Sequence, residues 1–308
     1  MRILVTGGHG FVGSHLLPKL QEEGHAVIAP TKDQIDLVHG DCLYGAVSCL
    51  ADMCQYRDIE AIIHLAATVD GLPGNIGNQG KFMHDNLLMG VHVLEAARLA
   101  EVAKVVNLGS VCGYHSVGPK PFKEENYWTG LPHESNRGYG MAKRATIMMG
   151  IEYNRQYGMD VTNLVPINLV GEGDVSTHVC VDLIKKFEEA KNNDDGPVTL
   201  WGRGTATREF CYAGDLADAI VMAVGRDVGP WPINIGTGRE ISIADLANLI
   251  REIGGYKSHI IWDHSKPEGQ GSRRLDISRA KELLGWEPKT SLREALKRTI
   301  EWNRERLS

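Results

Sequence analysis

The chain has 308 residues, 43% hydrophobic and 23% charged, with a formal net charge of −6. This suits one large α/β unit, or two domains that share a sheet, and argues against nucleic acid or an anionic membrane as a partner. No apolar run approaches membrane-spanning length, and the first strand follows Met1 directly, so we expect a cytoplasmic protein. The six cysteines form no C-x-x-C pair, which fits reduced thiols, and we expect no metal site.

A glycine-rich motif stands near the start of the chain. Ile3–Val5 form a short apolar run typical of a buried parallel strand. Gly7, Gly10 and Gly13 follow with the spacing G-x-x-G-x-x-G, and apolar residues recur at helical intervals from Phe11 onward. Glycines allow a tight turn, and a helix N-terminus presents N–H groups to an anion. The motif therefore favours a dinucleotide site over a glycine-rich turn without a ligand.

Strands and helices alternate through the first half of the chain. We expect further strands at 26–29, 61–67, 104–109 and 161–166, and helices at 86–103 and 139–157. This βαβα alternation predicts an α/β fold with a doubly wound parallel Rossmann sheet.

The second half of the chain is less regular. Helices are expected at 179–190, 215–224, 242–253, 278–284 and 291–305, the last three with a serine N-cap, and strands at 199–202 and 233–236. The strand at 233–236 should rejoin the large sheet. We expect a Rossmann domain of residues 1–169, to which 208–238 return, and a smaller C-terminal α/β substrate-binding lobe of 170–207 and 239–308. The active cleft would lie between them.

The end of the second strand bears on the choice of dinucleotide. An NAD site usually has an acid there, which bonds the ribose 2′-hydroxyl. Pro30 and Thr31 are not acids, whereas Lys32 could meet a 2′-phosphate. Asp33 has the general offset of an NAD acid but lies past the strand. The sequence favours NADP, leaves NAD open, and also allows Lys32 and Asp33 to be solvated loop charges.

Tyr139 and Lys143 form a second motif, Y-x-x-x-K. Residues four apart share one helix face, so the phenol and the ammonium can enter the same cleft. The cation is expected to lower the pKa of the phenol toward working pH. The tyrosine could then exchange a proton with a carbonyl or alcohol oxygen while hydride moves. Ser110, at a strand end, would bond the same oxygen or would be an ordinary turn serine.

These motifs resemble the extended short-chain dehydrogenase/reductases over essentially the whole chain. The matching residues are 6–13, His64-Leu-Ala-Ala67, Ser110, Tyr139 with Lys143, and Leu284-Gly-Trp286. Further runs resemble the branch of that family that uses NADPH to convert GDP-4-keto-6-deoxymannose to GDP-L-fucose, by epimerising C3 and C5 and reducing C4. These runs are 108–112, 152–158, 166–169, 177–179 with 185–187, 201–205, 208–210, 234–238 and 263–267.

The resemblance implies that Cys112 and His178 are the acid/base pair of the epimerisation. A C4 ketone acidifies the protons on C3 and C5, so a thiolate and an imidazole can remove and replace them. Tyr139 and Ser110 would hold the developing enolate oxygen. Taken singly, Cys112 would be interpreted as a small buried hydrophobe and His178 as a loop histidine.

The resemblance also implies residues for binding and assembly. For NADP they are Gly7, Gly10, Phe11, Val12, Lys32, Leu65, Ala66, Ala67, Leu108, Tyr139, Lys143, Pro166, Asn168 and Leu169. For the nucleotide sugar they are Ser110, Asn168, His178, Lys186, Trp201, Arg208 and Arg273, since guanidinium groups suit a diphosphate and an indole offers a flat face. Lys186 and Arg273 could equally be surface charges. A homodimer would form through the helices of Asn86 and Tyr139.

Several departures from the family pattern leave alternatives open. His9 stands for the basic residue of the glycine turn, Pro30 for an arginine, and Lys186 for another arginine. The segment 68–78 also matches poorly. The alternatives are a 4-reductase or an epimerase alone, acting on another GDP- or NDP-4-keto sugar such as a heptose. A more distant alternative is a non-catalytic dinucleotide sensor.

Overall fold

The computed structural model describes residues 1–39, 45–266 and 271–307. A six-stranded parallel sheet has the order β2-β1-β3-β4-β5-β9. Its strands are β1 (Arg2–Thr6), β2 (Ala26–Ile28), β3 (Ala61–His64), β4 (Lys104–Leu108), β5 (Asp160–Pro166) and β9 (Ile233–Ile235). The doubly wound α/β fold predicted from the sequence is confirmed, and β9 rejoins the sheet beside β5 as expected.

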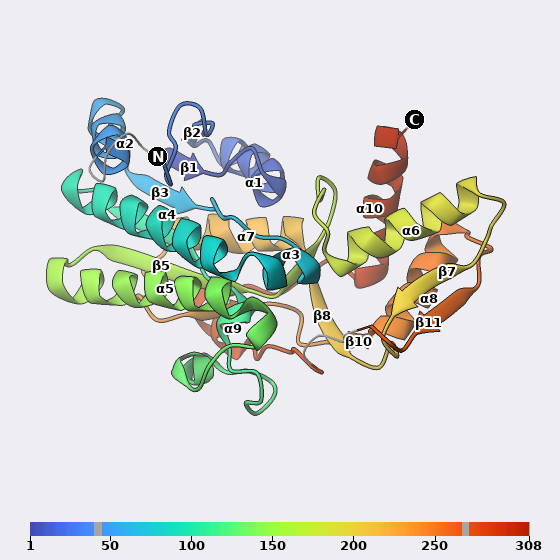
Figure 1. The fold of residues 1–308 in the computed structure, drawn as a ribbon. Coiled ribbons are helices and arrows are strands. Elements are labelled where there is room, and N and C mark those ends of the chain that lie inside the picture. The colour runs from blue at the N-terminus through green and yellow to red at the C-terminus, as the bar shows by residue number, and fades with distance from the viewer. Residues whose placement is uncertain (40–44, 267–270, 308) are drawn as a thin grey trace.

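Helices cover both faces of this sheet (Figure 1). Helix α1 (Phe11–Glu22) packs beside α7 (Ala213–Val224) on one face, and α2 (Gly45–Tyr56), α4 (Gln79–Leu99) and α5 (Arg137–Tyr157) lie on the other. Alternate residues of β1 point to opposite faces of the sheet. Ile3 and Val5 belong to the hydrophobic cluster around α1 and α7, whereas Leu4 belongs to the cluster around α2 and α4. Because both faces are buried there, Ile3–Val5 of β1 and Ala61–Ile63 of β3 are continuous apolar runs.

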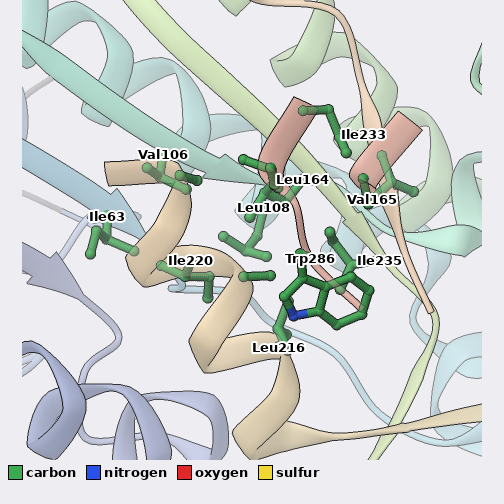
Figure 2. Close-up of a cluster of buried hydrophobic side chains, with 14 of the residues drawn as sticks. Ile63, Val106, Leu108, Leu164, Val165, Leu216, Ile220, Ile233, Ile235 and Trp286 are labelled. Atoms are coloured by element: carbon green, nitrogen blue, oxygen red, sulfur yellow. The ribbon is translucent and has the colours of Figure 1, made fainter. Parts of the chain in front are cut away.

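Helix α7 anchors the C-terminal segment to the sheet. Figure 2 shows Leu216 and Ile220 of α7 facing strand residues, with Trp286 beside Ile235 of β9. Trp286 is only 1% exposed, and its Nε1 donates to the carbonyl oxygen of Asp215 at 2.9 Å. The indole therefore fills the space between α7 and the edge strand while its one polar atom is paired.

A smaller group of elements lies to one side of the sheet (Figure 1). Helices α6 (Val179–Asn192), α8 (Ile243–Gly254) and α10 (Leu292–Leu307) pack with β7 (Val198–Trp201), which pairs with β11 (Ile260–Asp263). Three further strands, β6 (Asn168–Val170), β8 (Thr207–Tyr212) and β10 (Glu240–Ser242), form their own sheet. Two short helices, α3 (Leu72–Gly77) and α9 (Ser278–Leu284), complete the fold. The division of the chain at residue 169 stays a prediction.

Several local expectations differ from the structure. The sequence analysis missed α2 and α3, and α4 begins at Gln79 rather than near residue 86. The serine N-cap holds for α8, where the Ser242 side chain accepts from the Asp245 N–H, but α9 has Ile277 at that position. A turn formed by Asp276, which accepts from the Ser278 N–H at 2.9 Å, starts α9 instead.

Two further findings concern the residues that the structure describes. None of their helices is both long and apolar enough to cross a membrane. Five cysteines are free thiols. Cys42 lies outside the described residues, as does Pro267 of the run 263–267.

The packing of Trp286 yields a stability prediction. Replacing it with alanine leaves a cavity against α7 and β9, so we expect Trp286→Ala to lower the free energy of unfolding by about 3–5 kcal/mol. Trp231→Ala is the control. Trp231 is 49% exposed, so its replacement should lower the free energy of unfolding far less. Denaturant unfolding of the three proteins measures both values. Equal losses for the two variants would contradict this account of the core.

Candidate active site

A cavity of about 1250 Å³ extends from the turn between β1 and α1 to β7 and β8. The carboxyl ends of β3, β4 and β5 and the start of α6 also line it. Every residue that the sequence analysis assigned to cofactor, substrate or chemistry is among the lining residues. The fold thus brings together side chains from the glycine turn at residue 7 to Arg273. Their individual roles stay predictions.

The turn after β1 forms one end of the cavity. Gly7 has a φ of +72°, and a Cβ there would lie 2.6 Å from the backbone nitrogen of Ala66. Only glycine therefore allows β1 and the segment after β3 to meet so closely. Strands β2 and β3 lie on opposite sides of β1, which creates the crevice where α/β sheets bind ligands.

The first turn of α1 opens onto this crevice. Its N-cap is Gly10, and no side chain among the described residues caps it, so its N–H groups stay available to an anion. Gly10, Phe11 and Val12 all line the cavity. A backbone cradle with a free helix N-terminus fits the pyrophosphate of a dinucleotide.

The loop after β2 carries the charges that bear on the cofactor. Lys32 lines the cavity, and its Nζ lies 3.7 Å from a carboxylate oxygen of Asp36, which also lines it. Asp33, the acid weighed from the sequence, lies outside the lining residues. His9 is turned toward β2, with its Nε2 2.9 Å from the carbonyl oxygen of Ala29.

Asp36 is a lining acid that the sequence analysis missed. Burial opposes its ionisation, but the N–H groups of His39 and Val38, at 2.9 and 2.8 Å, and the charge of Lys32 together lower its pKa. Asp36 is therefore a carboxylate at neutral pH. Its position past the strand end, in a loop without a periodic pattern, concealed it in the sequence.

Tyr139 and Lys143 lie on α5 with both polar groups buried. Tyr139 is 8% exposed and Lys143 3%, and the Lys143 Nζ is 5.9 Å from the centre of the Tyr139 ring. Burial, together with the sulfur of Cys112, raises the pKa of Tyr139, although a hydrogen bond with Ser110 opposes this. The expected lowering of this pKa is therefore wrong. Burial disfavours the phenolate, so Tyr139 is a protonated phenol, able to act as an acid.

Burial also controls the groups around Lys143. It lowers the pKa of the ammonium to about 8. Burial and the charge of Lys143 lower the pKa of His64 to about 3. The His64 Nδ1 is 2.8 Å from the hydroxyl of Thr6, which joins the ends of β3 and β1. His64 is thus a neutral structural link behind the reacting groups.

Ser110 follows β4 and is held from two sides. Its Oγ accepts from the N–H of Cys112 at 3.1 Å and so caps the 3-10 turn Val111–Gly113. Its carbonyl accepts from the hydroxyl of the fully buried Tyr127, also at 3.1 Å. These bonds place Ser110 and Cys112 together on one rigid turn, with the serine hydroxyl bonded to Tyr139.

His178 is the N-cap residue of α6 and is exposed to the cavity. Its Nδ1 lies 2.8 Å from the Ser176 hydroxyl, which leaves Nε2 as the ring atom to meet a ligand. The neighbouring Thr177 hydroxyl donates to the carboxylate of Asp70, which also accepts from the Gly71 N–H at 2.7 Å. These bonds tie the poorly matching segment 68–78 to the chain beside His178.

The remaining predicted substrate residues come from the smaller group of elements and from the segment after β11. Lys186 is paired with Asp182 at 2.8 Å, and Arg208 donates to the Thr207 carbonyl at 2.7 Å. Trp201 is 45% exposed, with one ring face near Lys266. Arg273 is only 8% exposed, so it is not a surface charge.

Residues 3–236 match the family described as "NAD dependent epimerase/dehydratase family". The chain belongs to this family. It is an NAD(P)-dependent enzyme of the extended short-chain dehydrogenase/reductase type, in agreement with the glycine turn and the Tyr139/Lys143 pair. The resemblance stated from the sequence is thereby confirmed.

Several members of this epimerase/dehydratase family are similar over nearly the whole chain. A GDP-L-fucose synthase of Sinorhizobium fredii is 36% identical, covering 97% of this chain and 94% of the relative. A GDP-L-colitose synthase of Yersinia pseudotuberculosis is 31% identical, covering 98% and 97%. The solved structure of MlghC, a GDP-mannoheptose C4 reductase from Campylobacter jejuni with NADP bound, superimposes with a TM-score of 0.87 at 27% identity, covering 98% of each chain.

The burial of Lys143 predicts a pH dependence of stability. Between about pH 8 and about pH 10.4 the unfolded chain holds a proton that the folded protein has lost, so stability rises with pH by up to about 1.4 kcal/mol per unit. Lys143→Met removes this contribution. The free energy of unfolding of wild type minus that of Lys143→Met should therefore grow from about pH 7 to about pH 10. Lys257→Met, at an exposed lysine, should show a constant difference. Parallel curves for wild type and Lys143→Met would refute the burial effect.

Proposed function

We propose that this chain is an NADP-dependent epimerase/reductase of a GDP-4-keto-6-deoxymannose-type sugar, which epimerises C3 and C5 and reduces C4. The observation that carries the proposal is that Ser110, Tyr139 and Lys143 share one cavity with Cys112 and His178. The first three suit carbonyl reduction, and the other two suit proton exchange at carbon. The printed names of the Sinorhizobium fredii and Yersinia pseudotuberculosis relatives support a GDP-sugar substrate.

The reduction depends on a proton donor beside the C4 oxygen. NADPH, when bound, supplies the hydride. Tyr139 is protonated because burial raises its pKa, so it can donate to the oxygen as negative charge develops there. The Ser110 hydroxyl would hold the same oxygen. Lys143, with a pKa of about 8, is largely charged near neutral pH and would stabilise the phenolate that remains.

The epimerisation needs a base and an acid at C3 and C5. The Cys112 thiolate would take the proton, and the electron pair of the C–H bond would move to the C4 oxygen, where Tyr139 and Ser110 stabilise it. His178 would return a proton through Nε2, because Ser176 occupies Nδ1. A dinucleotide sensor would need neither the reducing group Ser110, Tyr139 and Lys143 nor the proton-exchanging pair Cys112 and His178. Their presence in one cavity disfavours that alternative. The cytoplasmic location and the homodimer stay predictions.

Turnover in deuterated water tests the proposal. We expect protein mixed with NADPH and GDP-4-keto-6-deoxymannose to oxidise NADPH and to give a product with deuterium at C3 and C5. Cys112→Ser and His178→Asn should each reduce deuterium incorporation at least about 100-fold. Cys49→Ser is the matched control, because Cys49 is an exposed thiol outside the cavity and its loss should change nothing.

Two other results would overturn the proposal. NADPH oxidation without deuterium at C3 and C5 would make the protein a 4-reductase, as the name of the Campylobacter jejuni neighbour suggests for that protein. If the protein turned over a GDP-4-keto-heptose but not this sugar, its substrate would be a heptose instead.

Lys32 offers a separate test of the cofactor. If its ammonium meets the 2′-phosphate, Lys32→Ala should raise KM for NADPH about tenfold or more and leave KM for NADH unchanged. Asp33→Ala, next to it but outside the cavity lining, is the control and should preserve the preference. Initial rates with the two cofactors decide. An equal effect of Lys32→Ala on both would remove Lys32 from phosphate recognition.

A further inference from the structure

Cys112 is contacted by two side chains that the proposed reaction does not use. Arg273 places its Nη1 3.6 Å from the Cys112 sulfur, and the amide of Asn136 lies 2.9 Å from the same sulfur. Both are almost fully buried, at 8% and 7% exposure, and both line the cavity. Charges interact more strongly in such a poorly solvated place than in water, so the guanidinium can act on the neighbouring sulfur.

Hydrogen bonds from neighbouring segments hold both residues in place. Glu240 on β10 accepts from the backbone N–H of Arg273 at 3.0 Å. With its amide oxygen toward Arg273, Asn136 accepts from Nη2 at 3.0 Å, and its Nδ2 donates to the His133 carbonyl at 3.1 Å. Asn136 precedes α5, far from Arg273 in the chain, so this contact exists only in the folded protein.

The two orientations of the Asn136 amide have different partners. With its oxygen toward Arg273, the amide bonds Nη2 and, through Nδ2, the His133 carbonyl. Turned over, Nδ2 lies at the Cys112 sulfur and both of those bonds are absent. The amide therefore orients Arg273 in the first of these two orientations.

The other cations near Cys112 are engaged elsewhere: Arg144 donates to the carbonyls of Gly113, Gly130 and Thr129, and Lys143 lies at the Tyr139 ring. Tyr139 and Tyr127 are phenols whose pKa burial raises, so both are neutral. Burial and the charge of Arg273 lower the pKa of His133, which keeps this imidazole neutral too. Arg273 is thus a cation that contacts the Cys112 sulfur directly.

We propose that Arg273, oriented by Asn136, is a positioning residue that stabilises the thiolate form of Cys112, instead of the diphosphate contact expected from the sequence. The use of the Cys112 thiolate as a base rests on the proposed function. The thiolate takes the proton from C3 or C5 and becomes a thiol, and the C–H electron pair moves to the C4 oxygen. The effect of the guanidinium on the sulfur exists in the protein without substrate.

Alkylation of Cys112 by iodoacetamide tests this in the ligand-free full-length protein. The rate, followed by the mass of the Cys112 peptide, rises with pH as the thiolate forms. We expect the midpoint to move up by about one pH unit or more in Arg273→Met, and by less in Arg273→Lys, which keeps the charge. Arg274→Met, next in the chain but outside the cavity lining, should keep the wild-type midpoint.

The two possible roles of Arg273 affect different parts of the alkylation profile. A purely structural role would alter the limiting rate at high pH but not the midpoint, so an unchanged midpoint in Arg273→Met overturns the proposal. If that variant does not fold, Asn136→Ala is measured in its place. An unchanged midpoint in Asn136→Ala would also overturn the proposal. A shifted midpoint combined with failure of the turnover test would refute the proposed reaction and leave the role of Arg273 intact.

Discussion

The close approach between the turn after β1 and the segment after β3 is the constraint on which the rest of the structure depends. A side chain at Gly7 would run into the backbone at Ala66, 2.6 Å away. Because Gly7 has no side chain, the two segments can meet, and α1 begins directly over the crevice between β1 and β3. The cavity continues from there along the strand ends, which position Ser110, Asn168 and the other lining residues.

Burial sets the electrostatics of this cavity more than pairwise charge does. It raises the pKa of Tyr139, lowers that of Lys143 to about 8, and keeps His64 neutral. Each shift favours the uncharged form, as expected where water is excluded. The ligand-free protein therefore holds a phenol ready to donate, and a lysine whose charge can respond to small changes in its surroundings. The pair Arg273 and Cys112 is the contrasting case, because there a buried charge lies directly against its target.

The carboxyl groups of Glu209 and Glu240 join the segments that form the far end of the cavity. Glu209, with no exposed surface, accepts from the N–H groups of Gly238 and Leu275, each at 2.8 Å. Glu240 accepts from the Arg273 N–H and from the Thr207 hydroxyl. These bonds connect β8 and β10 to the segment after residue 270, so that Arg208 and Arg273 reach one cavity from separate parts of the chain. Removal of Glu209 would leave several N–H groups without this acceptor, and removal of Glu240 would do the same to one N–H and two hydroxyls.

Features that depend on neighbours along the chain were determined by the sequence alone. The apolar run before Gly7, the glycine spacing, and the four-residue interval between Tyr139 and Lys143 specify a strand, a turn and one helix face without reference to the rest of the molecule. The family resemblance then identified lining residues as remote as Trp201, because motifs carry over position by position.

Other features were decided only by the tertiary structure. The direction of the Tyr139 pKa is one, because a sequence lists charges but not how deeply each is buried. The place of Asp36 in the cavity lining is another, because the path of its loop depends on the packing of the whole fold. The grouping of Asn136 and Arg273 around Cys112 is the third. It joins segments far apart in the chain, and no local spacing or periodicity records a contact that packing alone creates.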